Sequence, residues 1–336
     1  MATIKDVARA ARVSTATVSA VINNSAYVSP ELRSRVHSAI RDLDYAPSLL
    51  ARNLRHGRSE LIGLVVSDLA NPFYARVVWA AEAAVAAWGY SLVVFNSDEK
   101  PELEKRILAR IRTLQCEGAV LVPVGDAAQG LAPDFEGRAV PTVLFGRTLD
   151  NDRSDSVTID NLSASQQVTN YLIDLGHTRI GSITGPLQLS TGRGRFDGMT
   201  AAMAAKGLTV DPRHVRSGAF REDAAYSAAR SLFAQPDRPT AVYVANGVMA
   251  LGVMRAIADL GMKCPEDISV ASTDTIPGIG GLRPRLTRTE HPISDMVNES
   301  IRLLIDRIKR GNEVEPRNVV FQPALVVGDS CAPIRT

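Results

Sequence analysis

The first residues of the chain place apolar side chains at the three- and four-residue spacing of one helix face. These side chains are Ile4, Val7, Ala8 and Ala11. After a short break at Val13, Ser14 is suited to cap a second helix. The inner face of that helix would carry Val18, Val21 and Ile22. The pattern therefore predicts two short helices joined by a tight turn.

A third helix is predicted after Asn23 and Asn24, which are suited to end the second. Ser29 can cap the third helix, and Pro30 and Glu31 fit its first turn. Its apolar face would carry Leu32, Val36, Ala39, Ile40 and Leu43. Helices this short enclose only a small hydrophobic core. A domain of this size is marginally stable unless a neighbouring domain or a ligand stabilises it.

The segment that follows Pro47 leaves two interpretations open. Ser48 would cap a short helix with Leu50 and Leu54 four residues apart, among the basic side chains of Arg52, Arg55 and Arg58. Such a helix is unstable alone in water. The segment is either a linker before the next strand or a hinge that folds on DNA and inserts a leucine between base pairs.

From Leu61 onward, short apolar strands alternate with helices. Strands are expected at 61–66, 91–95, 118–122, 141–145, 179–183, 240–244, 267–271 and 319–327. Helices are expected at 73–88, 102–114, 161–175, 193–206, 222–234, 246–260 and 293–309. This alternation predicts an α/β architecture of doubly wound parallel sheets, and the length suffices for two of them.

The charge of the chain is unevenly distributed. Residues 1–60 hold nine Lys or Arg and five Asp or Glu, a balance of +4 within a total of +2. A basic head on a slightly acidic body is typical of a polyanion binder. The cysteines Cys116, Cys264 and Cys331 are widely spaced, which predicts neither a structural zinc site nor a disulfide framework. We expect no cofactor, no signal peptide and no membrane span, and therefore a cytoplasmic protein.

Several motifs now identify a resemblance. The chain is similar over nearly its whole length to the LacI/purine-repressor family of bacterial transcription regulators. The motifs are TIKDVARAARVSTATVSAVIN at the N-terminus, PSLLARNL, NPFY at 71–74, LGHTRIGSITG at 175–185, GRFDGM at 194–199 and LRPRLT at 282–287. The resemblance implies a helix-turn-helix headpiece over 1–46, a hinge helix and linker over 47–60, and a periplasmic-binding-protein-like core over 61–336. It also implies a homodimer on a near-palindromic operator.

The resemblance assigns roles in DNA binding. Thr15, Ala16 and Ala20 fall at base-reading positions of the recognition helix, and Leu54 matches the leucine that wedges into the minor groove. The expected DNA-contacting residues are Ser14, Thr15, Ala16, Thr17, Ser19, Ala20, Asn23, Tyr27, Leu54 and Arg55. Because two alanines offer only apolar contact to thymine methyl groups, this helix can specify only part of its operator.

Polar and aromatic residues at the ends of the predicted strands indicate an effector cleft, since ligands of parallel sheets bind there. The strand ends supply the expected effector-binding residues Phe73, Tyr74, Arg147, Phe220, Asn246 and Asp274. The resemblance to the purine repressor in TGPLQLSTGRGRFDG implies two more, Thr191 and Arg195. Gly146 and Gly247 stand where family members commonly carry Asp, and Leu189 stands where the purine repressor has an arginine. With fewer acids beside the two arginines, the sequence favours an anionic effector such as a sugar acid or sugar phosphate. A neutral sugar remains possible, and a purine is less favoured.

Two other classes of protein fit the sequence less well. A nucleotide-using enzyme is disfavoured, because the glycine run from Gly192 to Gly198 has the wrong spacing and lies far beyond its strand. A transport-type small-molecule-binding protein is disfavoured by the basic headpiece. We therefore expect a DNA-binding repressor, not an enzyme, whose operator binding is controlled by a small effector acting as inducer or corepressor.

Overall fold

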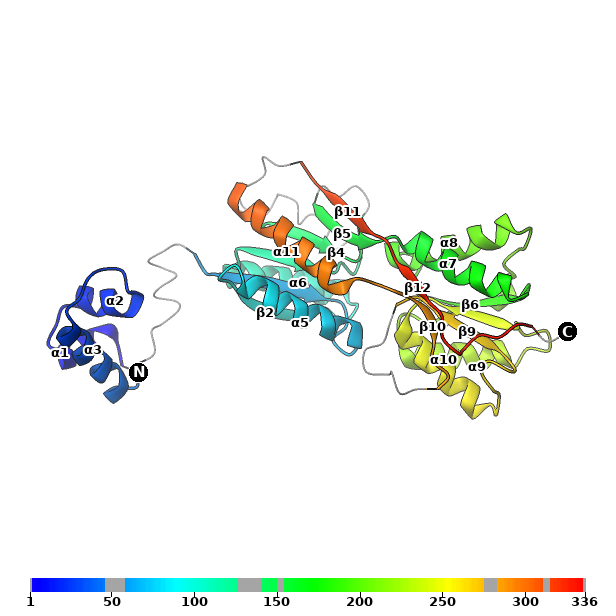
Figure 1. Ribbon diagram of the computed structural model, residues 1–336, viewed down its shortest axis with the longest axis horizontal. Helices are drawn as coiled ribbons and strands as arrows, with labels where there is room; N and C mark the ends of the chain where they lie inside the picture. The colour runs from blue at the N-terminus through cyan, green and yellow to red at the C-terminus, as the bar shows by residue number, and fades with distance from the viewer. Residues whose placement is uncertain are drawn as a thin grey trace. The chain divides into compact units, whose positions relative to one another are not determined.

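The computed structural model describes residues 2–45, 58–125, 140–149, 154–274, 283–310 and 315–334. The chain divides into two compact units, Met1–Ser59 and Glu60–Thr336 (Figure 1). We call them the headpiece and the core. The expected hinge helix, with Leu54 and Arg55, lies outside the described residues.

The headpiece contains the three predicted helices, α1 (Ile4–Ala11), α2 (Thr15–Asn23) and α3 (Pro30–Asp42). The predicted caps are confirmed: the Ser14 hydroxyl accepts a hydrogen bond from the backbone N of Thr17 at 3.0 Å. Asn24 ends α2 in the left-handed conformation, with φ of 49°. The buried side chains of this small core are Val7, Ala8, Ala11, Val18, Val21, Val36 and Ala39.

The first subdomain of the core is built on a parallel sheet in the order β11-β5-β4-β3-β1-β2. Its strands are β1 (Leu61–Val66), β2 (Ser91–Asn96), β3 (Gly118–Leu121), β4 (Thr142–Phe145), β5 (Asp155–Ile159) and β11 (Asn318–Phe321). Its helices are α5 (Pro72–Ala86), α6 (Pro101–Thr113) and α11 (Ile293–Arg310).

Alternate residues of these strands face opposite layers, as a pleated sheet requires. In β1, Ile62, Leu64 and Val66 pack with α5 and α11, whereas Val65 packs with α6. Helices therefore cover both faces of the sheet, and the predicted doubly wound architecture is confirmed.

The second subdomain repeats this plan with strand order β12-β10-β9-β8-β6-β7. Its strands are β6 (Ile180–Thr184), β7 (Val215–Ser217), β8 (Ala241–Val244), β9 (Ser269–Ser272), β10 (Thr287–Glu290) and β12 (Ala324–Val326). Its helices are α7 (Asn161–Asp174), α8 (Ser190–Ala205), α9 (Glu222–Phe233) and α10 (Gly247–Asp259), with a short 3-10 turn at Pro212–His214. Only β12 runs antiparallel to its neighbour.

The chain passes between the two subdomains from β5 to α7, from β10 to α11 and from β11 to β12 (Figure 1). Hydrophobic patterning missed three strands, β5, β7 and β10, and placed the start of α8 three residues late, at 193 instead of Ser190. The missed strands are rich in polar residues. In β10, for example, the fully buried positions are Thr287 and Thr289.

Composition gave two further expectations, one about the cysteines and one about membrane-spanning helices. The three cysteines are free thiols. Within the ranges that the structure describes, no helix is both long enough and apolar enough to cross a membrane.

Candidate functional site

A cavity open to solvent lies within the core, lined by residues from both subdomains. All the expected effector residues line it: Phe73, Tyr74, Arg147, Thr191, Arg195, Phe220, Asn246 and Asp274. Sequence reasoning missed several other lining residues, among them Asp68, Asn71, Glu99 and His291.

The polar lining residues follow the carboxyl ends of strands in both sheets. Asp68 follows β1, Glu99 follows β2, and Arg147 follows β4 in the first subdomain. Asn246 follows β8 and Asp274 follows β9 in the second. Parallel strands bring these loops to one edge of each sheet, so residues far apart in sequence meet around a common space.

The Arg147 guanidinium is already neutralised by a carboxylate. It forms two parallel bonds to Glu99, of 2.8 Å to Oε2 and 2.7 Å to Oε1, and its side chain is 5% exposed. A further bond of 3.1 Å reaches the carbonyl oxygen of Pro123. The premise that Arg147 lacks an acidic neighbour is therefore wrong: Glu99 takes that role from a loop 48 residues away.

Arg195 is also held by the protein. Its Nε donates to Asn161 Oδ1 at 2.8 Å, and its Nη1 donates to the carbonyl oxygen of Ala245 at 2.6 Å. Asp274 Oδ2 lies 3.8 Å from the same Nη1, while Asp274 Oδ1 accepts from the backbone N of Gly247 at 2.9 Å. Burial raises the pKa of Asp274 to about 6, against the opposing charge of Arg195. Above that pH the cavity holds an ionised carboxylate beside an arginine.

Two buried polar atoms of the cavity have no partner among the described residues. They are Thr191 Oγ1 and His291 Nε2, both on cavity-lining residues. Burial, with the nearby charge of Arg195, lowers the pKa of His291 to about 3, so its imidazole is neutral. A buried polar group without a partner is costly, and a ligand hydroxyl would satisfy either atom.

Aromatic rings form part of the wall. Phe73 meets Tyr74 edge to face at 5.2 Å, and the Tyr74 hydroxyl accepts from Ser67 at 2.8 Å. These two residues both pack the start of α5 and line the cavity. The Phe220 ring lies 5.6 Å from the Arg147 guanidinium. A Cβ atom at Gly185 would collide with the Phe220 ring, so glycine is required beneath it.

Backbone strain gathers at the cavity. Asp98, Glu99, Phe220 and Asp274 have positive φ angles of 51°, 54°, 56° and 65°, a region that residues other than glycine rarely adopt. Gly146 has a φ of 72°. A side chain there would be strained, which gives a physical reason for glycine at this position.

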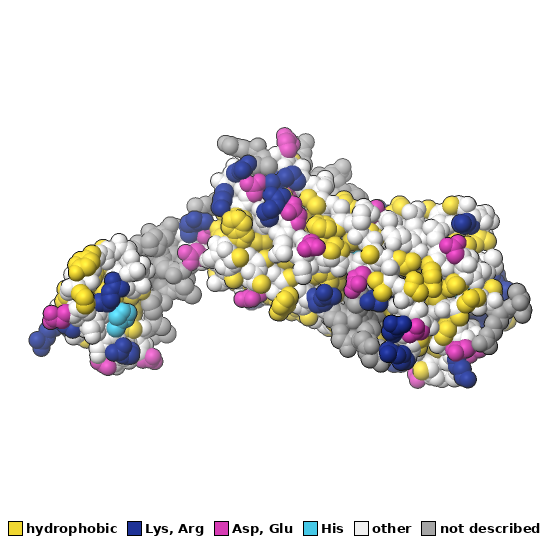
Figure 2. All heavy atoms as spheres, viewed as in Figure 1, with side chains coloured by type: hydrophobic (Ala, Val, Ile, Leu, Met, Phe, Trp, Pro, Cys, Tyr) yellow, Lys and Arg dark blue, Asp and Glu magenta, His cyan; other side chains and the backbone are white. Residues whose placement is uncertain are grey.

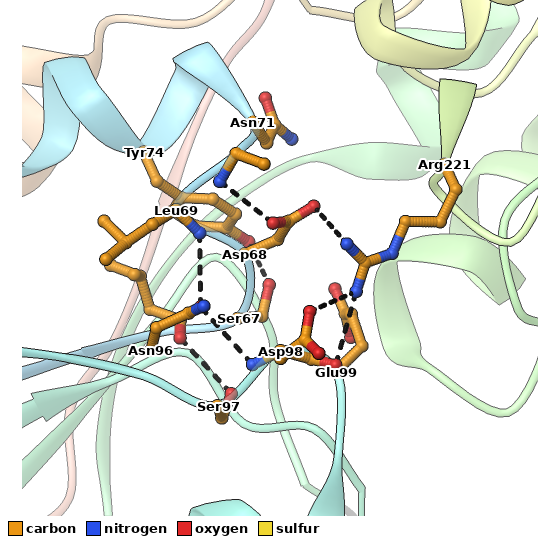
Figure 3. A network of polar contacts seen from close by, with 12 residues as sticks. Ser67, Asp68, Leu69, Asn71, Tyr74, Asn96, Ser97, Asp98, Glu99 and Arg221 are labelled. Carbon is orange, nitrogen blue, oxygen red and sulfur yellow. Dashed lines mark hydrogen bonds and ion pairs between the residues drawn. The ribbon is translucent and has the colours of Figure 1, made fainter. Parts of the chain in front are cut away.

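A polar network joins the loops after β1 and β2 to the second subdomain (Figure 3). Arg221, the residue before α9, reaches Asp68 Oδ2 at 3.0 Å and Asp98 Oδ1 at 2.8 Å. Asn96 Oδ1 accepts from the backbone N of Leu69 and of Asp98, which ties the two loops together.

In the headpiece, α2 presents small side chains outward. Thr15 and Ala16 are exposed, and Tyr27 beyond the helix is 91% exposed. Other expected DNA-contacting residues also bond within the helix: the Ser14 and Thr17 hydroxyls lie 2.9 Å apart, and Asn23 donates to the carbonyl oxygen of Ser19 at 3.0 Å. Ser19 and Ala20 are half-buried.

Two family models match this chain. The model for bacterial regulatory proteins of the lacI family matches residues 3–48, and the model for a periplasmic binding protein-like domain matches residues 169–331. The matches fall on the headpiece and on the core, respectively.

Relatives match over almost the full length. The ribose operon repressor of Escherichia coli (strain K12) is 36% identical, covering 92% of this chain and 93% of the relative. The transcriptional repressor PurR of Edwardsiella ictaluri is 33% identical, covering 99% and 97%.

Solved structures show the same fold. A lac repressor dimer bound to operator and an anti-inducer superposes with a TM-score of 0.83 at 26% identity, covering 98% of this chain and 99% of that one. A transcriptional regulator CelR–cellobiose complex has a TM-score of 0.73 at 32% identity, covering 98% and 100%.

Proposed function

This chain belongs to the lacI family of bacterial regulatory proteins, and from that premise we propose that its effector is a neutral, hydroxyl-rich molecule such as a sugar. Members of the family are DNA-binding repressors, not enzymes. The chain is accordingly a transcriptional regulator that acts as a dimer, and a small effector controls its binding to operator DNA.

The observation that carries the choice of effector is the pairing of the cavity arginines. An anionic ligand would have to compete with Glu99 for Arg147, because that guanidinium already makes a two-bond pair. It would also meet Asp68 and Asp274, which line the same cavity. A neutral sugar meets no such repulsion, and its hydroxyl groups can donate to these carboxylates.

The remaining lining supports the same choice. The unpartnered Thr191 and His291 atoms suit hydroxyl groups, and the rings of Phe73 and Phe220 suit the apolar face of a sugar ring. Two relatives point the same way by name, one a ribose operon repressor and the other a regulator in complex with cellobiose. The proposed effector contacts are Phe73, Tyr74, Arg147, Thr191, Arg195, Phe220, Asn246 and Asp274.

The proposed DNA-reading surface is the outer face of α2. Exposure of Thr15, Ala16 and Tyr27 supports it, and the remaining contacts are assigned on the family resemblance: Ser14, Thr17, Ser19, Ala20, Asn23, Leu54 and Arg55. The proposed domains are 1–46 for DNA binding, 47–60 for the hinge and 61–336 for the effector and the dimer contact. Because its partner is bacterial operator DNA, we assign the protein to the cytoplasm.

Calorimetric titration tests the effector class. The panel holds D-ribose and cellobiose as neutral sugars, ribose 5-phosphate and gluconate as anions, and hypoxanthine as a purine. We expect binding within the neutral group and none within the anionic group. Tight binding of an anion with no binding of neutral sugars would overturn the proposal.

The variant Glu99→Gln sharpens that titration. Removing this carboxylate leaves Arg147 charged and unpaired, so the variant should gain affinity for ribose 5-phosphate relative to the wild type. Glu102→Gln is the matched control, because Glu102 is an exposed carboxylate on α6 nearby in sequence. The control should behave as the wild type does.

Selection of binding sites from random DNA tests the operator function. The expected product is a near-palindromic site whose affinity falls steeply with added salt, because Lys and Arg contacts to phosphate release counterions. Absence of an enriched site would favour a small-molecule-binding protein without DNA function.

A further inference from the structure

Arg221 joins the two subdomains through Asp68, which lines the cavity. It belongs to the second subdomain, where it precedes α9, and both of its carboxylate partners belong to the first. Its Nη1 lies 3.0 Å from Asp68 Oδ2, and its Nη2 lies 2.8 Å from Asp98 Oδ1 (Figure 3). The Nη2 also donates to the carbonyl oxygen of Asp98 at 3.3 Å. One guanidinium thus bonds two loops of the opposite subdomain.

Hydrogen bonds within the first subdomain hold the two loops that carry Asp68 and Asp98. Asp68 Oδ1 accepts from the backbone N of Ala70 at 3.0 Å. The backbone N of Glu99 donates to the carbonyl oxygen of Ser67 at 2.8 Å, which bonds the β2 loop to the β1 loop. Asp98 itself sits in the left-handed region, with a φ of 51°. The two carboxylates are therefore a pre-organised acceptor for a forked cation.

The residue before Arg221 also contacts the first subdomain. Phe220 also belongs to the second subdomain, and its ring lies 5.6 Å from the Arg147 guanidinium of the first. Arg147 in turn pairs with Glu99, the residue after Asp98. We call Phe220 and Arg221 the clasp, since both contact the first subdomain.

Sheet topology puts the Arg221 contact away from the chain crossings. The crossings leave from β5, β10 and β11 and enter β12, strands at one end of each sheet order, β11-β5 and β12-β10. Arg221, in the loop after β7, bonds the loops after β1 and β2, and all three strands lie at the other end of each order. If the subdomains rotate apart about the chain crossings, a contact far from those crossings lengthens the most. Such a contact therefore opposes opening more strongly than one close to the crossings.

We propose that Arg221 is a positioning residue that holds the two subdomains closed at the edge opposite their covalent crossings, and so couples effector retention to operator affinity. Asp68 lies both in the clasp contact and in the cavity lining, so closure and effector binding share a side chain. Linkage then requires that a change in the closure equilibrium register at both binding sites.

Two measurements on the full-length dimer test this. The first is the dissociation rate of the neutral sugar that binds the wild type, with D-ribose tried first, by stopped-flow displacement. The second is affinity for the selected operator with no effector present, by fluorescence anisotropy. For Arg221→Ala we expect sugar dissociation about tenfold faster and operator affinity changed at least about threefold. Asp98→Ala should act in the same direction, and the double variant should add little.

Arg255→Ala is the matched control. Arg255 is a comparably exposed arginine that also bonds two carboxylates, Glu222 and Asp223, but all three lie in the second subdomain. It should leave both measurements unchanged. If Arg221→Ala matches Arg255→Ala in both, the proposal is wrong. It is equally wrong if only sugar dissociation changes, because Arg221 would then merely support the cavity.

The sugar-dissociation measurement rests on the proposed function, whereas the operator-affinity measurement does not. If no neutral sugar binds the wild type, the effector class fails and the operator measurement still decides the role of Arg221. A normal melting temperature for Arg221→Ala excludes loss of folding as the cause, and Arg221→Lys should restore only part of the effect, because an ammonium cannot fork to two acceptors.

Discussion

The headpiece and the core hold their functional side chains in opposite ways. In the headpiece, the candidate DNA contacts Thr15, Ala16 and Tyr27 are exposed and lie within one short stretch of chain. In the core, Arg147 and Arg195 are 5% and 6% exposed and depend on partners from distant segments. A duplex is read from outside, whereas a small effector must be enclosed.

Because of this difference, charged side chains contribute differently to the two regions. On the visible face of the core, basic and acidic side chains are interspersed (Figure 2), and around its cavity they are paired at bonding distance. Around the cavity, chemistry is therefore set by which charges remain uncompensated, not by which residues are present. On α2, the exposed residue types themselves define the surface.

The largest effect should come from breaking a buried pair in the core. Asp155 is fully buried and accepts bonds of 3.0 Å from both Arg307 and Arg317, tying β5 to α11 and to the residue before β11. Replacing it with Ala removes the buried carboxylate that Arg307 and Arg317 share, while Arg317 keeps its bond to Asp306, and should cost about 3–5 kcal/mol of unfolding free energy. Urea denaturation followed by circular dichroism measures this.

Asp211→Ala is the control for that experiment. Asp211 pairs with Arg213 at 2.8 Å on the surface, where solvent screens the interaction. We expect its denaturation midpoint to equal that of the wild type. An Asp155→Ala midpoint that also stays unchanged would contradict the view that buried charges in the core matter as pairs.

A smaller effect is expected for Val36→Ala in the headpiece. Val36 is fully buried among few other apolar side chains, so truncation should cost about 2 kcal/mol. Because the headpiece is a separate compact unit, operator affinity should fall while effector affinity stays constant. Parallel anisotropy and calorimetry titrations measure both, and a matching loss of effector affinity would refute the separation of the two units.

The pH dependence of effector binding should be smaller again. The pKa of Asp274 is raised to about 6 by burial, so this carboxyl is ionised at pH 7 and protonated at pH 5. An ionised carboxylate accepts hydroxyl bonds more strongly than a neutral carboxyl. Affinity for a neutral sugar should therefore fall by about tenfold from pH 7 to pH 5.

Two variants test whether the carboxyl group of Asp274 causes this pH dependence. Asp274→Asn should bind more weakly at pH 7 but with an affinity that no longer varies between pH 5 and pH 7. Glu104→Gln should keep the wild-type dependence, because Glu104, whose pKa burial raises to about 7, does not line the cavity. A pH dependence that survives Asp274→Asn would exclude this carboxylate as its source.

The smallest effect is expected for Thr15→Ala on α2. One hydroxyl contact to a base edge should contribute about 1 kcal/mol of discrimination, roughly a fivefold change in preference at one operator position. Effector affinity should stay constant. Binding to a panel of single-base operator variants measures this, and an unchanged preference at every position would remove Thr15 from the reading surface.

Local patterns in the sequence determined much of this molecule. Helix caps and apolar faces act over three or four residues, so Ser14, Ser29 and Asn24 were sufficient to predict the limits of α2 and the start of α3. The alternation of apolar strands with helices likewise predicted the doubly wound core. Since ligands of parallel sheets bind at strand ends, the same pattern predicted several of the residues that line the cavity, while Thr191 and Arg195 came from the family resemblance.

Tertiary structure alone decided the charge of the cavity. Glu99 and Arg147 are separated by 48 residues, and Asp68 and Arg221 by 153, so no short-range pattern reveals that they pair. The polar strands β5 and β10 escaped detection for a related reason: the buried side chains of Asp155 and Thr287 are stabilised by distant partners rather than by their own hydrophobicity. Long-range pairing compensates the charges that the sequence leaves apparently free, and this pairing is the basis on which we propose a neutral ligand in place of the expected anion.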